Sequence, residues 1–310
     1  MEKNSKIYVA GHTGLVGSAI IRNLIKKNFG NIITKEMDEL NLINCNTVAD
    51  FFKREKPEYV FIAAAKVGGI LANNTKKAEF IYENLQIQNN IIHNSYLNNV
   101  KKLLFLGSSC IYPKLCPQPI KEEYLLSGYL EETNNAYAIA KIAGITMCQS
   151  YNMQYNTNYI SVMPTNLFGY NDNFDLASSH VLPALIRKFH EAKINNQDKV
   201  SIWGTGKSRR EFLFVDDLAE ALLFLMENYN ENEIINVGIG KDITITELAL
   251  LIKEVINYNG NIEYDTSKPD GTPQKLLDVT KINNLGWKAK TSLKEGIELT
   301  YKWFLDRNKK

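Results

Sequence analysis

Gly11-His12-Thr13-Gly14-Leu15-Val16-Gly17 is the stretch of this sequence that decides the fold. It follows a β-rich run at residues 6–10 and precedes residues 18–27, whose apolar side chains recur with helical spacing. Glycines between a strand and a helix allow a tight turn, a close approach of the backbone to a pyrophosphate, and close packing of the helix. We therefore predict that this loop binds a dinucleotide; the simpler alternative is an ordinary strand-to-helix turn.

Apolar strand-like runs and helical segments alternate along the first half of the chain. Strands are predicted at residues 6–10, 31–34, 59–63, 102–106 and 159–163, and helices at 18–27, 47–52, 78–97 and around residue 137. Strands that are apolar throughout are typical of a parallel sheet covered on both faces. Ligands of such sheets bind beyond the carboxyl ends of the strands. The loops that follow these strands should therefore meet around one site.

Beyond about residue 168 the pattern changes to polar loops, a helix at 181–190 and a short strand at 200–204, and residues 260–275 are rich in Asp, Pro, Gly and Lys. We predict an α/β fold, a Rossmann-type doubly wound parallel sheet with a smaller C-terminal α/β substrate lobe. The nucleotide-binding domain would comprise residues 1–168 and 213–241. The lobe would comprise residues 169–212 and 242–310.

The composition is that of an ordinary globular protein, with 45% apolar residues, 23% charged residues and a net charge of +2. Such a charge gives no strong attraction to nucleic acid or to an anionic membrane. No run reaches the ~18 apolar residues that a membrane span needs. The four cysteines lack Cys-x-x-Cys spacing, so no zinc site is expected. With no apolar signal segment at the N-terminus, we expect a cytoplasmic protein without metal, nucleic acid or membrane partners.

Tyr137 and Lys141 lie four residues apart, so a phenol and an ammonium project from the same face of a helix. A nearby cation favours the phenolate and lowers a pKa that starts near ~10. The tyrosine then becomes a usable proton donor and acceptor at neutral pH. This spacing is common by chance, but the glycine loop upstream makes it informative. Together the two motifs predict a bound dinucleotide with a proton delivered beside it.

The G-x-x-G-x-x-G spacing resembles the loop of short-chain dehydrogenases/reductases, particularly their extended subgroup. The resemblance makes Ser108 the third member of a Ser-Tyr-Lys set. It implies that the Ser108 hydroxyl binds the substrate oxygen that Tyr137 protonates, and that Lys141 also holds the nicotinamide ribose. The alternative for Ser108 is a turn serine at the end of a strand.

The second strand should end near the adenosine ribose, where the sequence reads Thr34-Lys35-Glu36-Met37-Asp38. Lys35 could pair with a 2′-phosphate, which favours NADP(H) as the cofactor. Glu36 or Asp38 could instead accept a hydrogen bond from the 2′-hydroxyl of NAD. A third possibility is that all three side chains are simply solvated.

Longer blocks narrow the resemblance to the GDP-L-fucose synthase family. They are residues 63–70, 107–113, 163–167, 179–184 and 270–273, and the match runs from about residue 6 to 305. That family is an NADPH-dependent 3,5-epimerase/4-reductase of GDP-4-keto-6-deoxy-mannose. The resemblance implies cofactor contacts from the glycine loop (Gly11, Thr13, Gly14, Leu15, Val16, Gly17), Lys35, Ala63, Ala64, Ala65, Tyr137, Lys141, Pro164, Thr165, Asn166, Leu167 and His180.

The same resemblance assigns Cys110 and His180 to epimerisation. A C4 ketone acidifies the protons on C3 and C5, because the resulting carbanion is an enolate. Cys110 would act as the base and His180 as the acid, each contributing ~10²–10⁴-fold in rate. Cys110 should then be partly thiolate, helped by a nearby cation. Without the resemblance, Cys110 would be a buried packing residue and His180 a helix-cap histidine.

The GDP end of the substrate needs cations for its diphosphate. By family position these are Arg187, Lys188, Arg210 and Lys275, with Trp203 near the guanine or its ribose. Without the resemblance these would be surface cations, and Arg210 would pair with the adjacent Glu211. The complete implied set of substrate contacts is Val67, Ser108, Ser109, Cys110, Asn166, Arg187, Lys188, Trp203, Arg210 and Lys275.

The sequence departs from the family near the sugar. It reads Gly169-Tyr170-Asn171 where many members have Gly-Pro-His, and residues 175–178 also differ. A changed loop could admit a longer sugar, so a C4 reductase of a GDP-4-keto-heptose, with or without epimerase activity, is the main alternative. A GDP-mannose 4,6-dehydratase is less favoured, because Ser108-Ser109-Cys110 replaces the Thr-Asp-Glu-like acid pair of that chemistry.

One further alternative is not an enzyme. A nucleotide-sensing protein that kept the fold would usually lose the tyrosine or the lysine, and both are present.

The helices expected at 78–97 and 137–154 commonly pair in a four-helix interface in this superfamily, so we expect a homodimer. The product would be a GDP-activated deoxy sugar for capsule, lipopolysaccharide or glycan synthesis.

Overall fold

A computed structural model of the chain describes residues 1–268 and 270–307. Its centre is a six-stranded sheet in the order β10-β5-β4-β3-β1-β2. Every pairing in this sheet is parallel. The strands are β1 (Ile7–Ala10), β2 (Ile32–Ile33), β3 (Tyr59–Ile62), β4 (Lys102–Leu106), β5 (Tyr159–Pro164) and β10 (Ile235–Val237).

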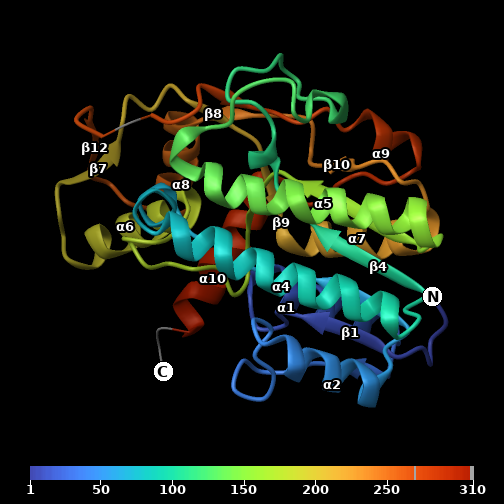
Figure 1. Ribbon diagram of the computed structural model, residues 1–310. Helices are drawn as coiled ribbons and strands as arrows, with labels where there is room; N and C mark the ends of the chain where they lie inside the picture. The colour runs from blue at the N-terminus through green and yellow to red at the C-terminus, as the bar shows by residue number, and fades with distance from the viewer. Residues whose placement is uncertain (269, 308–310) are drawn as a thin grey trace.

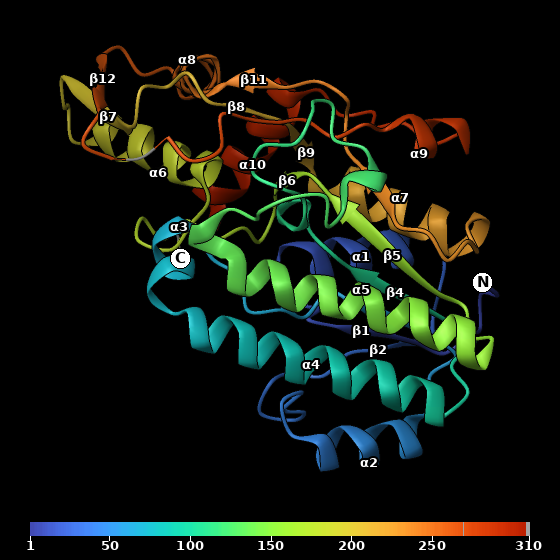
Figure 2. The same cartoon turned by 45° about the horizontal axis from the view of Figure 1, so that its top comes forward.

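Helices cover both faces of this sheet. Figure 2 shows α4 and α5 running side by side on one face, with α1 and α7 behind the sheet. The bounds are α1 (Leu15–Lys26), α2 (Cys45–Glu55), α4 (Lys77–Leu97), α5 (Asn135–Tyr155) and α7 (Val215–Asn228). Since strands buried on both faces must be apolar throughout, the arrangement explains the continuous apolar runs. The predicted fold class, a Rossmann-type α/β sheet, is confirmed.

A second group of elements lies to the left of the large sheet in Figure 1 and extends across the top of the view. Its strands are β7 (Lys199–Trp203), β8 (Arg209–Arg210), β11 (Ile243–Thr244), β12 (Asn261–Asp265) and β13 (Gln274–Lys275), and its helices are α6 (Val181–Ile194), α8 (Ile245–Ile256) and α10 (Leu293–Arg307). β7 pairs with β12, and β8 lies between β11 and β13. Their apolar side chains form a buried cluster separate from that of the large sheet.

The division into residues 1–168 plus 213–241 and residues 169–212 plus 242–310 stays a prediction. The two buried clusters support it over most of the chain. However, Leu277, Val279, Ile282 and Trp287 pack in the cluster of the large sheet. β6 (Asn166–Phe168) and β9 (Phe212–Phe214) pair with each other where the chain passes between the two groups.

Side chains cap the starts of α2 and α8. Asn44 accepts hydrogen bonds from the backbone amides of Asn46 and Thr47 at the start of α2. Thr244 and Glu247 form a reciprocal capping box at the start of α8. Within residues 1–268 and 270–307, no helix combines the length and the apolar character that crossing a bilayer requires.

The end of α7 is held by a buried lysine. Lys102, on β4, is 4% exposed. Its Nζ donates hydrogen bonds to the carbonyl oxygens of Leu225, Met226 and Tyr229 and to Asn230 Oδ1, at 3.2, 3.0, 2.5 and 3.0 Å. The last carbonyls of a helix have no partner within the helix, and a cation there also suits the helix dipole. Lys102 thus joins the end of α7 to the start of β4, an interior strand of the sheet.

Replacing Lys102 by Met should lower the free energy of unfolding by roughly 1–3 kcal/mol, because buried carbonyls lose their donor. Urea denaturation would measure the change. Lys101→Met is the matched control: this neighbour is exposed and pairs with Glu58. That variant should cost no more than about 1 kcal/mol. Equal losses in the two variants would contradict the helix-end role of Lys102.

Candidate active site

The glycine loop lies at the point where the order of the sheet reverses. From β1 the chain continues to β2 on one side, and β3 lies on the other side. Such a switch point is where open α/β sheets bind ligands. Gly11 has φ +81°, and a side chain there would meet the backbone of Ala64 at 2.7 Å. The loops after β1 and β3 therefore touch, as the predicted contacts at residues 63–65 require.

Gly17 is the position where the loop packs on its own helix. A Cβ at Gly17 would lie 2.0 Å from the carbonyl oxygen of Gly11. Gly14 is the N-cap residue of α1, and the first turn of this helix carries no acidic side chain. The backbone amides in the first turn of α1 can therefore face a pyrophosphate. The cradle that the missing side chains leave fits a dinucleotide.

At the adenosine end, the charged residues after β2 pair with one another. Lys35 Nζ lies 2.7 Å from Glu39 Oε1, and His12 Nε2 lies 3.3 Å from Glu36 Oε1. Glu39 also accepts the backbone amide of Glu36, at 3.0 Å. Lys35 therefore stands beside the expected ribose position but has an acidic partner that the sequence analysis did not identify.

Four of the predicted catalytic residues come together beyond the carboxyl end of β4: Ser108, Cys110, Tyr137 and Lys141. Ser108 is the N-cap residue of a short 3₁₀ helix, residues 109–111, and its hydroxyl accepts the backbone amide of Cys110 at 3.3 Å. Lys141 Nζ lies 5.7 Å from the centre of the Tyr137 ring and donates to the carbonyl oxygen of Leu106 at 2.7 Å. The strand end thus fixes the ammonium, and α5 presents the phenol beside it.

The expectation that Lys141 lowers the pKa of Tyr137 is wrong. Burial raises the pKa of Tyr137, ionisation of the neighbouring Cys110 would raise it further, and a hydrogen bond with Ser108 offsets only part of the increase. Burial also lowers the pKa of Lys141 to about 8. Desolvation penalises both charged forms, and burial is the largest cause of the shift in each pKa. The phenol is therefore held protonated, the state that a proton donor to a ketone needs.

The expectation that Cys110 is partly thiolate is also wrong. Burial raises the pKa of the Cys110 thiol, although Lys275, Ser108 and Lys141 each lower it. His180, the N-cap residue of α6, makes no capping hydrogen bond with its side chain. Burial lowers the pKa of this imidazole, and the charge of Lys275 lowers it further. At neutral pH both groups are therefore uncharged, and both are close enough to Lys275 to feel its charge.

Lys275 links this chemistry to a second cation, Arg210. Burial lowers the pKa of Arg210 and of Lys275, and the charge of Arg210 lowers that of Lys275 further. Arg210 donates to the carbonyl oxygens of Arg209 and Asp270, at 2.8 and 3.4 Å. Lys275 also lines a pocket with Ser109 and Cys110. Two adjacent, partly buried cations are suited to a bound anion such as a diphosphate.

Trp203 and Lys188 form a second predicted contact region. Trp203 is 47% exposed. Lys188 Nζ lies 5.5 Å from the centre of its ring and donates to the Ser201 carbonyl oxygen at 3.0 Å. Lys268, which the sequence analysis missed, approaches the same ring at 5.7 Å. An exposed indole flanked by ammonium groups can stack on a base or ribose close to phosphate.

Arg187 is placed differently from the other predicted cations. Its guanidinium pairs with Glu191 at 2.7 Å and donates to the Phe174 carbonyl oxygen at 3.2 Å. It therefore holds the loop after β6 rather than joining Arg210. Of the remaining predicted contacts, Val67 is 63% exposed and Ser109 is buried.

Glu211 is buried, and it does not make the ion pair with Arg210 that was the alternative to a substrate role for that arginine. Its carboxylate instead accepts the backbone amides of Ile239, Gly240 and Leu277 at 2.6, 2.7 and 3.0 Å. Burial raises its pKa. Its own carbonyl oxygen accepts Thr165 Oγ1 and Asn166 Nδ2, at 3.3 and 2.7 Å. The predicted cofactor residues at 165–166 are thereby tied to the segment that carries Arg210.

Comparison with known proteins shows the family to which the chain belongs. A model of the NAD dependent epimerase/dehydratase family matches residues 7–238. GDP-L-fucose synthase 1 of Arabidopsis thaliana is 57% identical over 304 residues, which cover 98% of this chain and 94% of that protein.

Two solved structures from Campylobacter jejuni are also similar. A GDP-6-OMe-4-keto-L-xylo-heptose reductase has a TM-score of 0.96 and 46% identity, and the match covers 99% of each chain. A GDP-mannoheptose C4 reductase with NADP bound has a TM-score of 0.92 and 47% identity, over 98% of this chain and 99% of that one.

Proposed function

Because this chain belongs to the NAD dependent epimerase/dehydratase family, and within it to the GDP-L-fucose synthases, we propose that it is a GDP-keto-sugar reductase and epimerase. It reduces the C4 ketone of a GDP-4-keto sugar with NADPH and inverts C3 and C5 of the same sugar. The observation that carries the proposal is the convergence of Ser108, Tyr137, Lys141 and Cys110 beyond β4, next to the cation pair at Lys275.

Reduction needs a proton for the C4 oxygen as well as a hydride. The glycine loop, Lys35 and Lys141 would hold the cofactor, which supplies the hydride when bound. Ser108 binds the ketone oxygen and Tyr137 protonates it. The raised pKa of Tyr137 keeps the phenol protonated until negative charge develops on that oxygen.

Epimerisation precedes reduction, because only the ketone acidifies C3 and C5. Cys110 removes a proton from one face of the sugar and His180 returns one to the opposite face. The reactive pair, a thiolate and an imidazolium, holds as many protons as the neutral pair, so the site needs no net proton uptake. The charge of Lys275 favours the thiolate in this exchange.

A GDP-4-keto-heptose is the alternative substrate, supported by the two Campylobacter structures. The loop that departs from the family touches the segment that carries the predicted substrate contact Val67, because the Ser178 carbonyl oxygen accepts the backbone amide of Gly69 at 2.8 Å. Tyr170, within the departure, packs its ring against Phe214 and the Arg22 guanidinium. The altered residues thus reshape a loop that touches residues 67–69.

NADPH consumption with GDP-4-keto-6-deoxy-mannose, measured beside its heptose counterpart, tests the reaction and the sugar together. We expect faster turnover of the hexose, with solvent deuterium at C3 and C5 of the product formed in heavy water. Faster turnover of the heptose would favour the alternative. A product without deuterium at either carbon would show that epimerisation is lost, whereas no NADPH consumption with either sugar would refute the proposal.

The cellular setting belongs to the same proposal. The enzyme acts in the cytoplasm, where nucleotide sugars and NADPH are available, and supplies a GDP-sugar for capsule, lipopolysaccharide or glycan synthesis. Two copies pair as a homodimer through α4 and α5, which lie side by side and expose Tyr82, Ile139 and Met153.

A further inference from the structure

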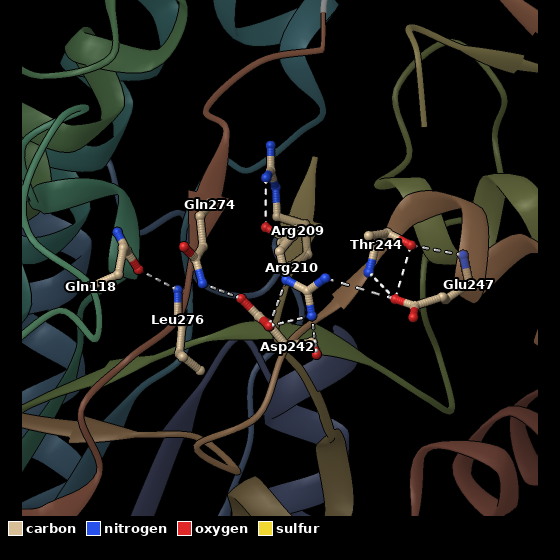
Figure 3. A network of polar contacts seen from close by, with 8 residues as sticks. All are labelled: Gln118, Arg209, Arg210, Asp242, Thr244, Glu247, Gln274 and Leu276. Carbon is tan, nitrogen blue, oxygen red and sulfur yellow. Dashed lines mark hydrogen bonds and ion pairs between the residues drawn. The ribbon is translucent and has the colours of Figure 1, made fainter. Parts of the chain in front are cut away.

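Asp242 ties together three short strands, two of which carry Arg210 and Lys275, the cation pair. Its side chain is 8% exposed. Oδ1 lies 2.9 Å from Arg209 Nε and 2.8 Å from Arg209 Nη2, and Oδ2 accepts Gln274 Nε2 at 2.6 Å. Its carbonyl oxygen accepts Arg209 Nη2 at 3.1 Å. Asp242 precedes β11, Arg209 lies on β8 and Gln274 on β13, so one carboxylate connects all three strands (Figure 3).

The register of these strands relates Asp242 to the proposed anion site. In the parallel pair of β8 and β13, Arg209 lies opposite Gln274 and Arg210 lies opposite Lys275. Successive side chains of a strand point to opposite faces. Asp242 holds Arg209 and Gln274 on one face of the strand pair. Arg210 and Lys275 are therefore presented on the opposite face. Figure 3 shows the Arg210 side chain extending away from Asp242, while Arg209 turns toward it.

The hydrogen bonds of Asp242 with Arg209 and Gln274, which we call the Asp242 clamp, are needed because β8 and β13 are only two residues long each. So short a pairing contributes few backbone hydrogen bonds, and it must keep two like charges side by side. Asp242 neutralises the charge of Arg209 on the face opposite Arg210 and Lys275. Thr244 and Glu247 then fix the end of β11 to α8 through the capping box. The clamp is thereby anchored to a helix.

We propose that Asp242 is a positioning residue for substrate binding: by holding Arg209 and Gln274 it sets the spacing of Arg210 and Lys275 for the two phosphates of a nucleoside diphosphate. This inference rests on the proposed function, which supplies the diphosphate ligand. Asp242 itself touches no substrate in this scheme. Its loss should therefore affect phosphate recognition and leave the nucleoside and cofactor sites unchanged.

Isothermal titration calorimetry with GDP and with guanosine tests the proposal, alongside NADPH binding measured by fluorescence. Asp242→Asn should weaken GDP binding about tenfold, the scale of a lost hydrogen bond to a charged group. Guanosine and NADPH affinities should stay within about twofold, where a general loss of structure would weaken all three. Glu254→Gln is the matched control. It removes an exposed carboxylate of α8 that pairs with Lys294 of α10, and it should leave all three affinities unchanged.

A double-mutant cycle separates the positioning role from a direct one. In an Arg210→Met/Lys275→Met background, Asp242→Asn should produce no further loss of GDP affinity. An equal loss in both backgrounds would overturn the proposal, as would unchanged GDP binding in Asp242→Asn alone. If Asp242→Asn does not fold, Gln274→Met removes a single partner and should show the same pattern with a smaller effect. Unchanged GDP binding in the Arg210→Met/Lys275→Met variant would instead refute the GDP site of the proposed function.

Discussion

Tyr137→Phe should slow reduction of the keto sugar by about 10²–10⁴-fold, the contribution expected of a positioned proton donor. The change removes one hydroxyl from the centre of the catalytic cluster. Without it, the oxygen at C4 gains negative charge with no acid to neutralise it. The cofactor is held mainly by the glycine loop, so NADPH affinity should stay within about twofold. Stopped-flow NADPH oxidation and fluorescence titration would measure the two effects.

Tyr229→Phe provides a chemically identical control. Tyr229 is 2% exposed and its hydroxyl donates to the Glu233 carbonyl oxygen at 2.9 Å, away from the catalytic cluster. Losing this hydrogen bond should cost about 1 kcal/mol of stability and leave turnover unchanged. Near-normal turnover by Tyr137→Phe would remove the proton-donor role. A matching loss of turnover in Tyr229→Phe would show that packing, not chemistry, explains the effect.

The large sheet could be predicted from the sequence because its signals are local. Each of its first strands is a continuous apolar run, and the glycine loop marks where β1 passes into α1. Apart from β7, which was expected at residues 200–204, the strands of the smaller group could not be predicted in the same way. β12 and β13 lie in a segment rich in Asp, Pro, Gly and Lys, and only their pairing with β7 and β8 makes them strands. In such cases tertiary contacts override local preference.

The catalytic residues could be named from motifs, but their protonation could not. Spacing shows that a lysine lies near a tyrosine, whereas the pKa of each depends on how deeply the site is buried. The supporting residues were missed for a related reason. Glu211 and Asp242 act on backbone and side-chain groups far away in sequence. The one local signal was Glu211 itself, a charge directly before the apolar run 212–215.

Gly17→Ala should abolish tight cofactor binding, even though local preference predicts a more stable helix. Gly17 is the third residue of α1, and alanine inside a helix is favoured over glycine by about 1 kcal/mol. Here, however, the new Cβ would lie 2.0 Å from the Gly11 carbonyl oxygen and 2.7 Å from His12 Cα. Both are backbone atoms, so the loop must move. A displacement of about 1 Å at such a site can cost about a hundredfold in function.

We therefore expect NADPH affinity to fall about a hundredfold and the free energy of unfolding to fall by about 1–3 kcal/mol in Gly17→Ala. Fluorescence titration and urea denaturation would measure the two changes. Gly30→Ala is the matched control, because an added Cβ there meets no atom within 4 Å. That variant should be neutral or slightly stabilising, by up to about 1 kcal/mol, since alanine restricts the unfolded chain. If Gly17→Ala binds NADPH as the unmodified chain does, the glycine loop does not form the cofactor cradle, and the proposed reductase chemistry loses its source of hydride.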